Sequence, residues 1–331
     1  MEVVLKDISD NFSGALHTIL VTGATGFIGT HLVKKLLRSG YKVKIYSRQP
    51  FERAEPRLVD EINWHQGSIE DLDSLVSAFR DVDSVVHLAG LAHAGDKDTE
   101  AASEVNTGGC ENVYSACVHA GVKKFISFSS IHAAYPDYSP YAASKHAAEE
   151  YLKASSLKNT NLRVIILRPS TVYGPGMKGN LATYFRYAAR GLMPSLPRLA
   201  NKLCLVSVED LCKVAMSVTD AEITAKGVLI YTVTDGLEYD ANSVENILYQ
   251  HLGRRKPWIT VPVWVLRLAA VAAQIANTTG IKKNQIGVRL FDNLVGHRQR
   301  RQPSHAPHFD FIPTDTLESQ MPNIISSLVR N

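Results

Sequence analysis

The sequence predicts an α/β protein built on a doubly wound parallel sheet, with a smaller mixed lobe towards its C-terminal end. Three observations lead to this prediction. Short apolar segments typical of buried strands alternate with helical patterns from residue 18 to residue 169. A glycine-rich turn joins the first of these strands to the first helix. Beyond Pro169 the alternation stops, and proline and glycine punctuate the chain as far as Pro197.

The same change of pattern divides the 331 residues into three parts. Residues 1–17 are expected to form an N-terminal extension, residues 18–169 a dinucleotide-binding domain, and residues 170–331 a substrate-binding lobe. Two apolar runs of the last part, residues 203–208 and 228–233, are expected to return to the sheet.

Two segments of the lobe differ from their surroundings. The apolar segment 261–276 contains Arg267 and Gln274, which predicts a packed helix and no membrane span. Residues 296–308 are polar and basic, which predicts a solvated loop; a flap that contacts substrate phosphates is the alternative.

Composition is that of an ordinary globular protein, with 45% hydrophobic and 21% charged residues. The formal net charge is +4, and no basic stripe is interleaved with aromatic residues, which argues against a nucleic-acid partner. The four cysteines form no Cys-x-x-Cys pair and have no histidines at zinc spacing. They therefore predict reduced thiols, a cytoplasmic location and no metal site. The N-terminus carries acidic residues early and lacks the long apolar core of a signal peptide.

The first strand, turn and helix form the strongest local signal. An apolar run at residues 19–21 is followed by Gly23, Gly26 and Gly29, and then by an amphipathic pattern that ends at Ser39-Gly40. Without side chains, such a turn lets backbone N–H groups approach a pyrophosphate at the positive end of the helix dipole. The segment predicts a dinucleotide site.

The following elements continue the alternation. Further strands are predicted at residues 42–46, 64–66, 84–88, 124–128 and 162–167, and helices at residues 71–80, 101–120 and 139–153. Strands that alternate with helices pair in parallel through right-handed crossovers, and their ligands bind at the carboxyl ends of the strands.

A second constellation suggests acid–base chemistry. Tyr141 and Lys145 are four residues apart on a predicted helix that begins at Ser139-Pro140, so they share one face. A neighbouring ammonium favours the phenolate, and we expect it to lower the pKa of Tyr141 towards the working range. Ser129-Ser130 ends the fifth strand, where its hydroxyls would face the ligand crevice.

Six motifs follow one another along the chain: Thr22-Gly-Ala-Thr-Gly-Phe-Ile-Gly29, His87-Leu-Ala-Gly90, Asn106-Thr-Gly-Gly109, Ser129-Ser130, Tyr141-x-x-x-Lys145 and Leu167-Arg-Pro-Ser-Thr-Val-Tyr-Gly-Pro-Gly176. Together they resemble the extended short-chain dehydrogenase/reductase family, in its nucleotide-sugar epimerase/dehydratase and 4-keto-reductase branch. The resemblance implies a Rossmann-type sheet, a nicotinamide cofactor, a nucleotide-sugar substrate and a homodimer.

The resemblance also assigns roles to residues. Tyr141 would exchange a proton with the substrate oxygen, Lys145 would lower its pKa and hold the nicotinamide ribose, and Ser130, with Ser129 as the alternative, would hydrogen-bond the reacting oxygen. The implied cofactor-binding residues are Gly23, Thr25, Gly26, Phe27, Ile28, Gly29, Ser47, Arg48, Ser68, Ile69, Leu88, Ala89, Gly90, Asn106, Ser129, Tyr141, Lys145, Pro169 and Thr171. The implied substrate residues are Ser130, His93, Thr171, Lys178, Asn180 and Lys202.

The chain departs from the family's pattern at the end of the second strand. Many sugar-nucleotide epimerases have an Asp there for the ribose 2′-hydroxyl, whereas this chain has Ser47 followed by Arg48. A basic residue at this place accommodates a 2′-phosphate, which favours NADP(H), with NAD(H) as the alternative. Ser68 stands where an acidic residue often approaches the adenine.

Further departures concern the substrate. Thr171 stands where the family often has a substrate-binding Asn, and Leu203, beside Lys202, stands where an Arg often clamps the diphosphate. The interval from Ser130 to Tyr141 is shorter than in many of these enzymes. These differences imply a substrate mouth of a different shape from that of the UDP-glucose enzymes.

Four functions follow as alternatives. The preferred one is a reductase of a UDP-linked 4-keto-hexose, and the second is a UDP-hexose 4-epimerase. The others are a sterol- or phenylpropanoid-type alcohol dehydrogenase and a non-catalytic dinucleotide-binding regulator. The sugar is preferred because several basic residues of the lobe suit a diphosphate: Lys178, Arg186, Arg190, Arg198 and Lys202.

Overall fold

The structure, a computed structural model, describes residues 17–51, 62–91, 103–159, 161–197, 202–223, 227–260, 262, 265 and 311–329. The predictions for residues 261–276 and 296–308 fall almost entirely outside these ranges. The chain forms two compact units. The sheet unit comprises Met1–Ser170, Val208–Val233 and Pro303–Ile312, and the smaller unit comprises Thr171–Ser207, Thr234–Gln302 and Pro313–Asn331.

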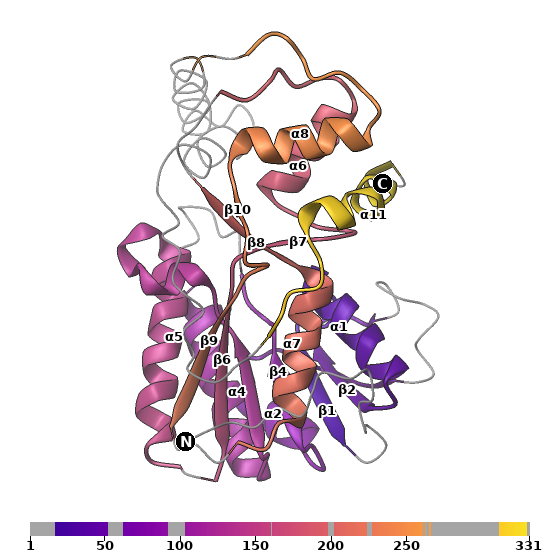
Figure 1. The fold of residues 1–331 in the computed structure, drawn as a ribbon. Coiled ribbons are helices and arrows are strands. Elements are labelled where there is room, and N and C mark those ends of the chain that lie inside the picture. Colours follow the sequence, from indigo (N-terminus) through magenta and orange to yellow (C-terminus); the bar gives the residue numbers. More distant parts are fainter. Residues whose placement is uncertain are drawn as a thin grey trace, which may run out of the picture. The chain divides into compact units, whose positions relative to one another are not determined.

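A seven-stranded sheet in the order β3-β2-β1-β4-β5-β6-β9 runs through the described part of the sheet unit (Figure 1). Every neighbouring pair in it is parallel. Its strands are β1 (Thr18–Thr22), β2 (Lys42–Ser47), β3 (Ile62–Gln66), β4 (Ser84–His87), β5 (Lys124–Phe128), β6 (Arg163–Pro169) and β9 (Val228–Val233). The predicted doubly wound parallel sheet is confirmed, with the change of strand order between β1 and β4.

Helices cover both faces of this sheet. On one face α1 (Phe27–Arg38) packs against α7 (Val208–Asp220). On the other face α4 (Gly109–Ala120) packs between α2 (Leu72–Ala78) and α5 (Pro140–Ser156). The core beneath these three helices is apolar, and strand residues such as Leu20 and Phe125 are fully buried in it. A sheet covered on both faces explains why the strands read as continuous apolar runs.

The ends of the helices follow their local sequence. Ser39 is the C-cap of α1, and Gly40 after it has a φ of +80°. Gly121, in the left-handed conformation, is the C-cap of α4. Ahead of α4, the turn η4 (Glu104–Gly108) is π-helical, so the predicted helix over residues 101–120 is not regular throughout. Such turns are often found at functional sites.

The smaller unit contains a three-stranded sheet in the order β10-β8-β7, with β7 (Thr171–Tyr173) parallel and β10 (Glu238–Tyr239) antiparallel to β8 (Leu203–Ser207). Its helices are α6 (Asn180–Ala189), α8 (Ala241–His251) and α11 (Leu317–Val329).

One of the two returning segments was predicted wrongly. Residues 228–233 do join the large sheet, as β9 beside β6. Residues 203–207 do not, because as β8 they pair with β7 and β10 in the small sheet. A buried apolar run predicts a strand, but it carries no information on which strand will be its partner.

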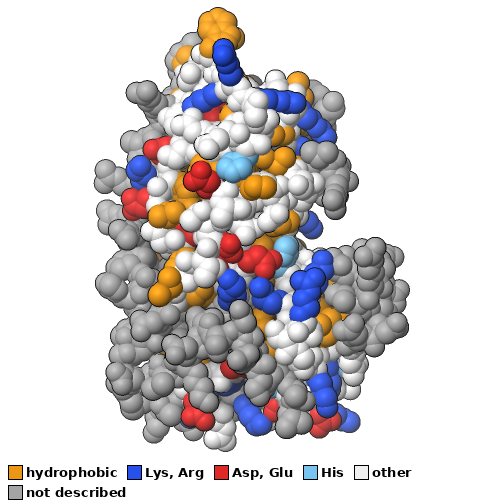
Figure 2. All heavy atoms as spheres, turned by 45° about the vertical axis from the view of Figure 1, so that its right-hand side comes forward, with side chains coloured by type: hydrophobic (Ala, Val, Ile, Leu, Met, Phe, Trp, Pro, Cys, Tyr) orange, Lys and Arg blue, Asp and Glu red, His pale blue; other side chains and the backbone are white. Residues whose placement is uncertain are grey.

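No helix in the described ranges is long and apolar enough to cross a membrane. On the face shown in Figure 2, basic and acidic side chains are interspersed among the described residues. This mixture agrees with the small net charge of +4.

Candidate active site

The turn between β1 and α1 passes very close to the end of β4. Gly23 has a φ of +71°, and a Cβ placed on it would stand 2.5 Å from the backbone N of Ala89. Only glycine fits so close an approach in that conformation. The backbone N of Gly26 donates to the O of Gly23 at 3.0 Å, which closes the turn directly before α1.

The start of α1 is suited to an anion. Its first turn, which the structure describes in full, carries no acidic residue, so the positive end of the helix dipole is not compensated from within the helix. Thr25 is exposed at the turn, Phe27 and Ile28 are half-buried, and Gly29 is buried in the helix. A turn of small residues ahead of an uncompensated helix N-terminus fits the pyrophosphate of a dinucleotide.

The end of β4 is tied to β1 by a buried histidine. Nδ1 of His87 shares a hydrogen bond with Oγ1 of Thr22 at 2.8 Å, and that oxygen also accepts from the backbone N of Ala89 at 3.4 Å. Burial is the main reason that the pKa of His87 falls to about 3, and nearby Lys145 contributes. His87 is therefore neutral at neutral pH and holds the segment that begins at Leu88.

The predicted cofactor residue Asn106 lies in η4 and is buried. Its Oδ1 accepts from the backbone N of Leu91 at 2.8 Å, and its Nδ2 donates to the O of Leu91 at 3.1 Å and to Oγ of Ser144 at 3.0 Å. A Cβ on Gly90 would stand 2.7 Å from this Oδ1 and 3.4 Å from Nζ of Lys145. Asn106 therefore positions the backbone of Gly90 and Leu91 beside Lys145.

The end of β2 holds Ser47 and Arg48. The hydroxyl of Ser47 donates to the O of Gln49 at 2.6 Å and accepts from Nε1 of Trp64 at 3.0 Å. Arg48 is exposed. Both residues were predicted to contact a 2′-phosphate. The hydroxyl of Ser47 forms hydrogen bonds within the fold, whereas the side chain of Arg48 lies at the surface.

The predicted adenine-side residues lie after β3. Oγ of Ser68 donates to Oε2 of Glu70 at 3.1 Å. The O of Ile69 accepts from Nδ2 of Asn112 at 3.1 Å, and its side chain packs closely over Gly109. Ile69 thereby connects the segment after β3 to the start of α4, whereas the Ser68 hydroxyl bonds within that segment.

The α5 helix begins where its sequence predicts. Oγ of Ser139 accepts from the backbone N of Ala142 at 3.1 Å, and Pro140 occupies the first turn. This start places Tyr141 in the first turn and Lys145 one turn later. Lys145 is buried, and its Nζ donates to the O of Phe128 at 2.9 Å.

The structure brings Ser130, Tyr141 and Lys145 together. Ser130 lies just past β5, is buried, and forms a hydrogen bond with the Tyr141 hydroxyl. Its Oγ also accepts from the backbone N of His132 at 3.2 Å. The hydroxyl of Ser129, by contrast, donates to Oε1 of Glu149 at 2.5 Å. Ser130, and not Ser129, is the serine that contacts Tyr141 here.

The expected lowering of the Tyr141 pKa is wrong. Burial raises the pKa of Tyr141 to about 12, and the hydrogen bond from Ser130 lowers it only in part. Burial also lowers the pKa of Lys145, against the charge interactions with Cys110 and Glu149 that raise it. The spacing of four residues indicated a shared face but carried no information on desolvation, which is the larger effect.

Sequence reasoning missed two residues next to Ser129, which are Glu149 and Arg168. Glu149 is buried and forms an ion pair with Arg168, in which Nε of Arg168 donates to Oε1 at 2.9 Å and to Oε2 at 3.2 Å. Glu149 stands four residues beyond Lys145, so the helical period places it on the same face. That spacing is the signal that could have identified it.

The remaining predicted residues are distributed between the two units. Pro169 ends β6 in the sheet unit, opposite Val233 of β9. In the smaller unit Thr171 and Lys178 are exposed, and Asn180 is the first residue of α6. Nζ of Lys202 lies 3.4 Å from Oδ2 of Asp240. His93 and Arg198 lie outside the described residues.

Two of the basic residues expected to meet a diphosphate stand at one helix end. Arg186 is in the last turn of α6, and Arg190 directly follows the helix. Positive side chains at this end interact favourably with the helix dipole, so this placement has a structural explanation of its own.

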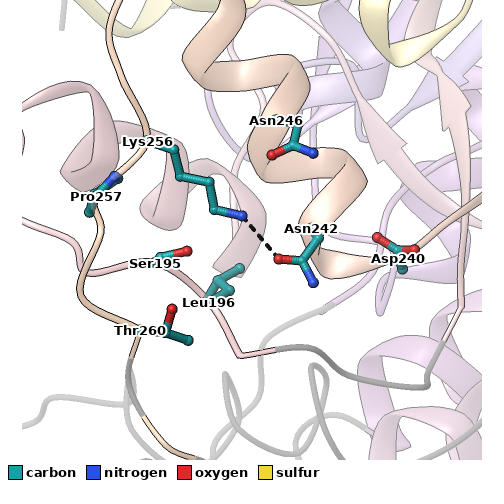
Figure 3. A pocket seen from close by; sticks show the side chains of 8 residues that line it. All are labelled: Ser195, Leu196, Asp240, Asn242, Asn246, Lys256, Pro257 and Thr260. Carbon is teal, nitrogen blue, oxygen red and sulfur yellow. Dashed lines mark hydrogen bonds between the residues drawn. The ribbon is translucent and has the colours of Figure 1, made fainter.

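A cavity of about 690 Å³ lies in the smaller unit (Figure 3). Its lining is mostly polar and comprises Ser195, Leu196, Asp240, Asn242, Asn246, Lys256, Pro257 and Thr260. Nζ of Lys256 donates to Oδ1 of Asn242 at 3.0 Å and pairs with the buried Glu245 at 2.5 Å. Since Asp240 is paired with Lys202, both charges of the lining have partners. The cavity suits a ligand that forms hydrogen bonds, and the sequence predicted none of its residues.

All four cysteines lie in the described ranges, are buried and form no disulfide, in agreement with the predicted reduced thiols. Burial raises the pKa of Cys110 to about 11, and it also raises the pKa values of Cys117 and Cys212. Within the described ranges, no cluster of histidine, cysteine or acidic side chains could hold a metal ion.

Comparison with known proteins agrees with this geometry. The model of the NAD dependent epimerase/dehydratase family matches residues 19–227. A UDP-glucose 4-epimerase of Vibrio cholerae is 33% identical over 277 residues, which cover 76% of this chain and 80% of that protein. A ceramide reductase of Caulobacter vibrioides is 34% identical over 198 residues, 58% of this chain and 57% of that protein.

Solved structures show the same fold. The structure of UDP-glucose 4-epimerase from Bifidobacterium longum in complex with NAD+ and UDP superimposes with a TM-score of 0.69, at 19% identity. The match covers 95% of this chain and 98% of that one.

Proposed function

The chain belongs to the NAD dependent epimerase/dehydratase family, and from that premise we propose that it is an NADP(H)-dependent oxidoreductase acting at carbon four of a UDP-hexose. The direction we propose is reduction of the 4-keto sugar. The observation that supports an enzyme, and not a non-catalytic regulator, is the assembly of Ser130, Tyr141 and Lys145 at the end of β5.

Each of these side chains has a role at the substrate. Tyr141 gives a proton to the C4 oxygen during reduction and takes it back during oxidation. Ser130, hydrogen-bonded to Tyr141, holds that oxygen in line. Lys145, buried as an ammonium beside them, favours the phenolate once the site is closed by ligands and holds the nicotinamide ribose.

Several features of the chain suit the dinucleotide. The turn at Gly23 and the N-terminus of α1 would hold the pyrophosphate, and the backbone at Gly90 would face the ribose that Lys145 binds. The bound cofactor supplies the hydride donor or acceptor. Exposed Arg48 would accept the 2′-phosphate, which is why we propose NADP(H) over NAD(H).

Net reduction and epimerisation use the same three side chains, so the choice rests on the cofactor. An epimerase keeps its cofactor bound through the cycle, whereas a reductase exchanges it each time. Arg48 suits an exchangeable NADPH, and Leu203 stands where many epimerases carry an Arg. By analogy with the family we also propose a homodimer.

The experiment uses two reactions of the purified protein. One contains a UDP-4-keto-hexose with NADPH, and the other contains a UDP-hexose without added cofactor. Stoichiometric loss of NADPH absorbance in the first alone supports the reductase. Interconversion of C4 epimers in the second, without net redox change, would establish the epimerase instead.

A second candidate is reduction of a long-chain lipid ketone, favoured by the 34% identity to a ceramide reductase. In the smaller unit Trp258 is 91% exposed and Ile259 is 56% exposed, which provides apolar surface. A third reaction, with a keto-ceramide in detergent and NADPH, tests it. NADPH loss there, with none on the nucleotide sugar, would replace the first proposal.

A further inference from the structure

The last residues around β5 are tied to three successive turns of α5. Phe128 accepts a hydrogen bond from Lys145 through its O, Ser129 donates to Glu149, and Ser130 bonds to Tyr141. Tyr141, Lys145 and Glu149 are four residues apart and share one face of the helix. Two of these links involve Tyr141 and Lys145, whose roles in the reaction are described above. The third, between Ser129 and Glu149, has no role in it so far.

We propose that Glu149 is a positioning residue for the reaction of Ser130, Tyr141 and Lys145, a proposal that rests on the function proposed above. It acts in two ways. Its carboxylate holds Ser129, and through the next peptide bond it sets where the Ser130 hydroxyl lies. Its negative charge holds Lys145 in the ammonium form that supports Tyr141.

The first action follows from the contacts of the carboxylate. Glu149 is 1% exposed, and it accepts from Ser129 and from Arg168 at both of its oxygens. The backbone N of Ser129 also donates to the O of Leu167 at 2.7 Å, on the strand that carries Arg168. The serine is therefore held from both sides, by α5 and by β6, and Ser130 follows it directly.

The second action follows from the charges around Lys145. Burial lowers the pKa of Lys145, and Cys110 from α4 and Glu149 from α5 oppose this. His87 on β4 is neutral at neutral pH, because its pKa is about 3. Cys110 is neutral as well, because burial raises its pKa to about 11. Of these neighbours, Glu149 is the one whose carboxylate forms an ion pair, and its partner Arg168 holds it in place.

The direction in which Glu149 shifts the pKa of Lys145 follows from its charge. The negative charge of Glu149 raises the pKa of Lys145 above the value that burial alone would set. Removing it lowers that pKa, so the ammonium is lost at a lower pH. Cofactor binding that needs protonated Lys145 should then be lost at a lower pH than in the wild-type protein.

The test measures NADPH and NADH binding by nicotinamide fluorescence from about pH 6 to about pH 10. In Glu149→Gln the midpoint at which binding is lost is expected to fall by about one pH unit. The matched control is Glu150→Gln, the same change one residue later, where the side chain is exposed and pairs with Lys153 at 2.6 Å. The control should keep the wild-type midpoint. Equal midpoints in all three proteins would overturn the charge role.

A second variant separates the two actions. Ser129→Ala removes the hydroxyl and leaves the pair of Glu149 with Arg168 intact. It is expected to lower kcat about tenfold, as loss of one orienting contact does, with an unchanged midpoint for cofactor binding. An unchanged kcat would overturn the role in placing Ser130. The cofactor titration needs no substrate, so absence of turnover on nucleotide sugars would defeat the proposed function and leave the Glu149 result readable.

Glu149→Gln leaves Arg168 without its ion pair, which is costly in a buried position. If that variant does not fold, Glu149→Leu combined with Arg168→Leu removes both charges together and leaves neither unpaired. The double variant should show the same fall in the cofactor-binding midpoint. A wild-type midpoint in the folded double variant would overturn the proposal.

Discussion

Asn106 holds Leu91 by both of its backbone groups, accepting from the N at 2.8 Å and donating to the O at 3.1 Å. This pairing reaches across 15 residues and is buried on the side of Asn106. It fixes the segment after β4, whose residue Gly90 fits between the Asn106 amide and the Lys145 ammonium.

Replacing Asn106 with Asp should therefore destabilise the fold and weaken cofactor binding. Asp can accept from the N of Leu91 but cannot donate to its O or to Ser144, so two acceptors lose their donor. The expected loss in the free energy of unfolding is about 1–3 kcal/mol, measured by urea denaturation. Asn63→Asp, the same change on the exposed side of β3, is the control and should stay within about 0.5 kcal/mol. Equal losses in the two variants would contradict the role of the hydrogen bonds between Asn106 and Leu91.

Tyr141→Phe should lower kcat by roughly 10²–10⁴-fold and leave cofactor affinity nearly unchanged, because general acid–base catalysis supplies about that factor. Lys145→Met should lower both kcat and cofactor affinity, since Lys145 supports Tyr141 and holds the nicotinamide ribose. Tyr151→Phe, ten residues further along α5 and paired edge-to-face with Tyr114, is the matched control. Near-normal turnover of the Tyr141→Phe enzyme would falsify the assignment.

Arg48→Ala should reduce the preference for NADPH over NADH. A charge-assisted hydrogen bond contributes about 1.5–3 kcal/mol, so the Kd for NADPH should rise roughly 10- to 100-fold, with little change for NADH. Arg38→Ala, at the exposed end of α1, controls for the general loss of positive charge. If the Kd values for the two cofactors are equal in wild type and respond equally to the change, Arg48 does not recognise the phosphate.

Glu209 predicts an acid-dependent loss of stability. His31 and Lys35 of α1 hydrogen-bond its carboxylate at 3.0 and 2.9 Å and are the main reason that the pKa of Glu209 falls to about 2. A carboxylate with a lowered folded pKa stabilises the protein above its unfolded pKa, 4.5 in the reference state, and loses that contribution as pH falls through about 2. The side chain is 35% exposed, so solvent screening reduces the contribution to about 1 kcal/mol.

Urea denaturation of wild type and Glu209→Gln should therefore differ by about that amount at neutral pH, and the difference should shrink towards pH 2. Glu104→Gln, an exposed residue in η4, is the control at each pH. A difference that stays constant from neutral to acid pH would show that the carboxylate of Glu209 does not act through its charge.

In the smaller unit, Glu245 is fully buried and gathers four donors. It accepts from Tyr184 at 2.9 Å, Ser195 at 2.9 Å and the backbone N of Leu196 at 3.0 Å, and it pairs with Lys256. Tyr184→Phe should lower the free energy of unfolding by about 1.5–3 kcal/mol, because a buried carboxylate loses a hydrogen bond. Tyr187→Phe, on the same helix but 37% exposed, should change little. Equal denaturation midpoints for the two variants would contradict the role of this network.

The sequence by itself was sufficient for features that depend on neighbours along the chain. The strand, turn and helix at residues 18–38, the cap at Ser139 and the shared face of Tyr141 and Lys145 are such features, and each is present. Periodicity, capping and glycine conformation act over a few residues, so a local pattern contains the information.

Tertiary structure decided what depends on distant partners. It placed residues 203–207 in the small sheet, directed Ser129 towards Glu149 and Ser130 towards Tyr141, and assembled a polar cavity from segments near residues 195, 240 and 256. It also set the pKa of Tyr141 at about 12, through burial that no spacing reveals. Strand pairing, desolvation and the lining of a cavity arise when segments distant in the sequence pack together and exclude water. A local sequence pattern contains no information on which distant segments will do so.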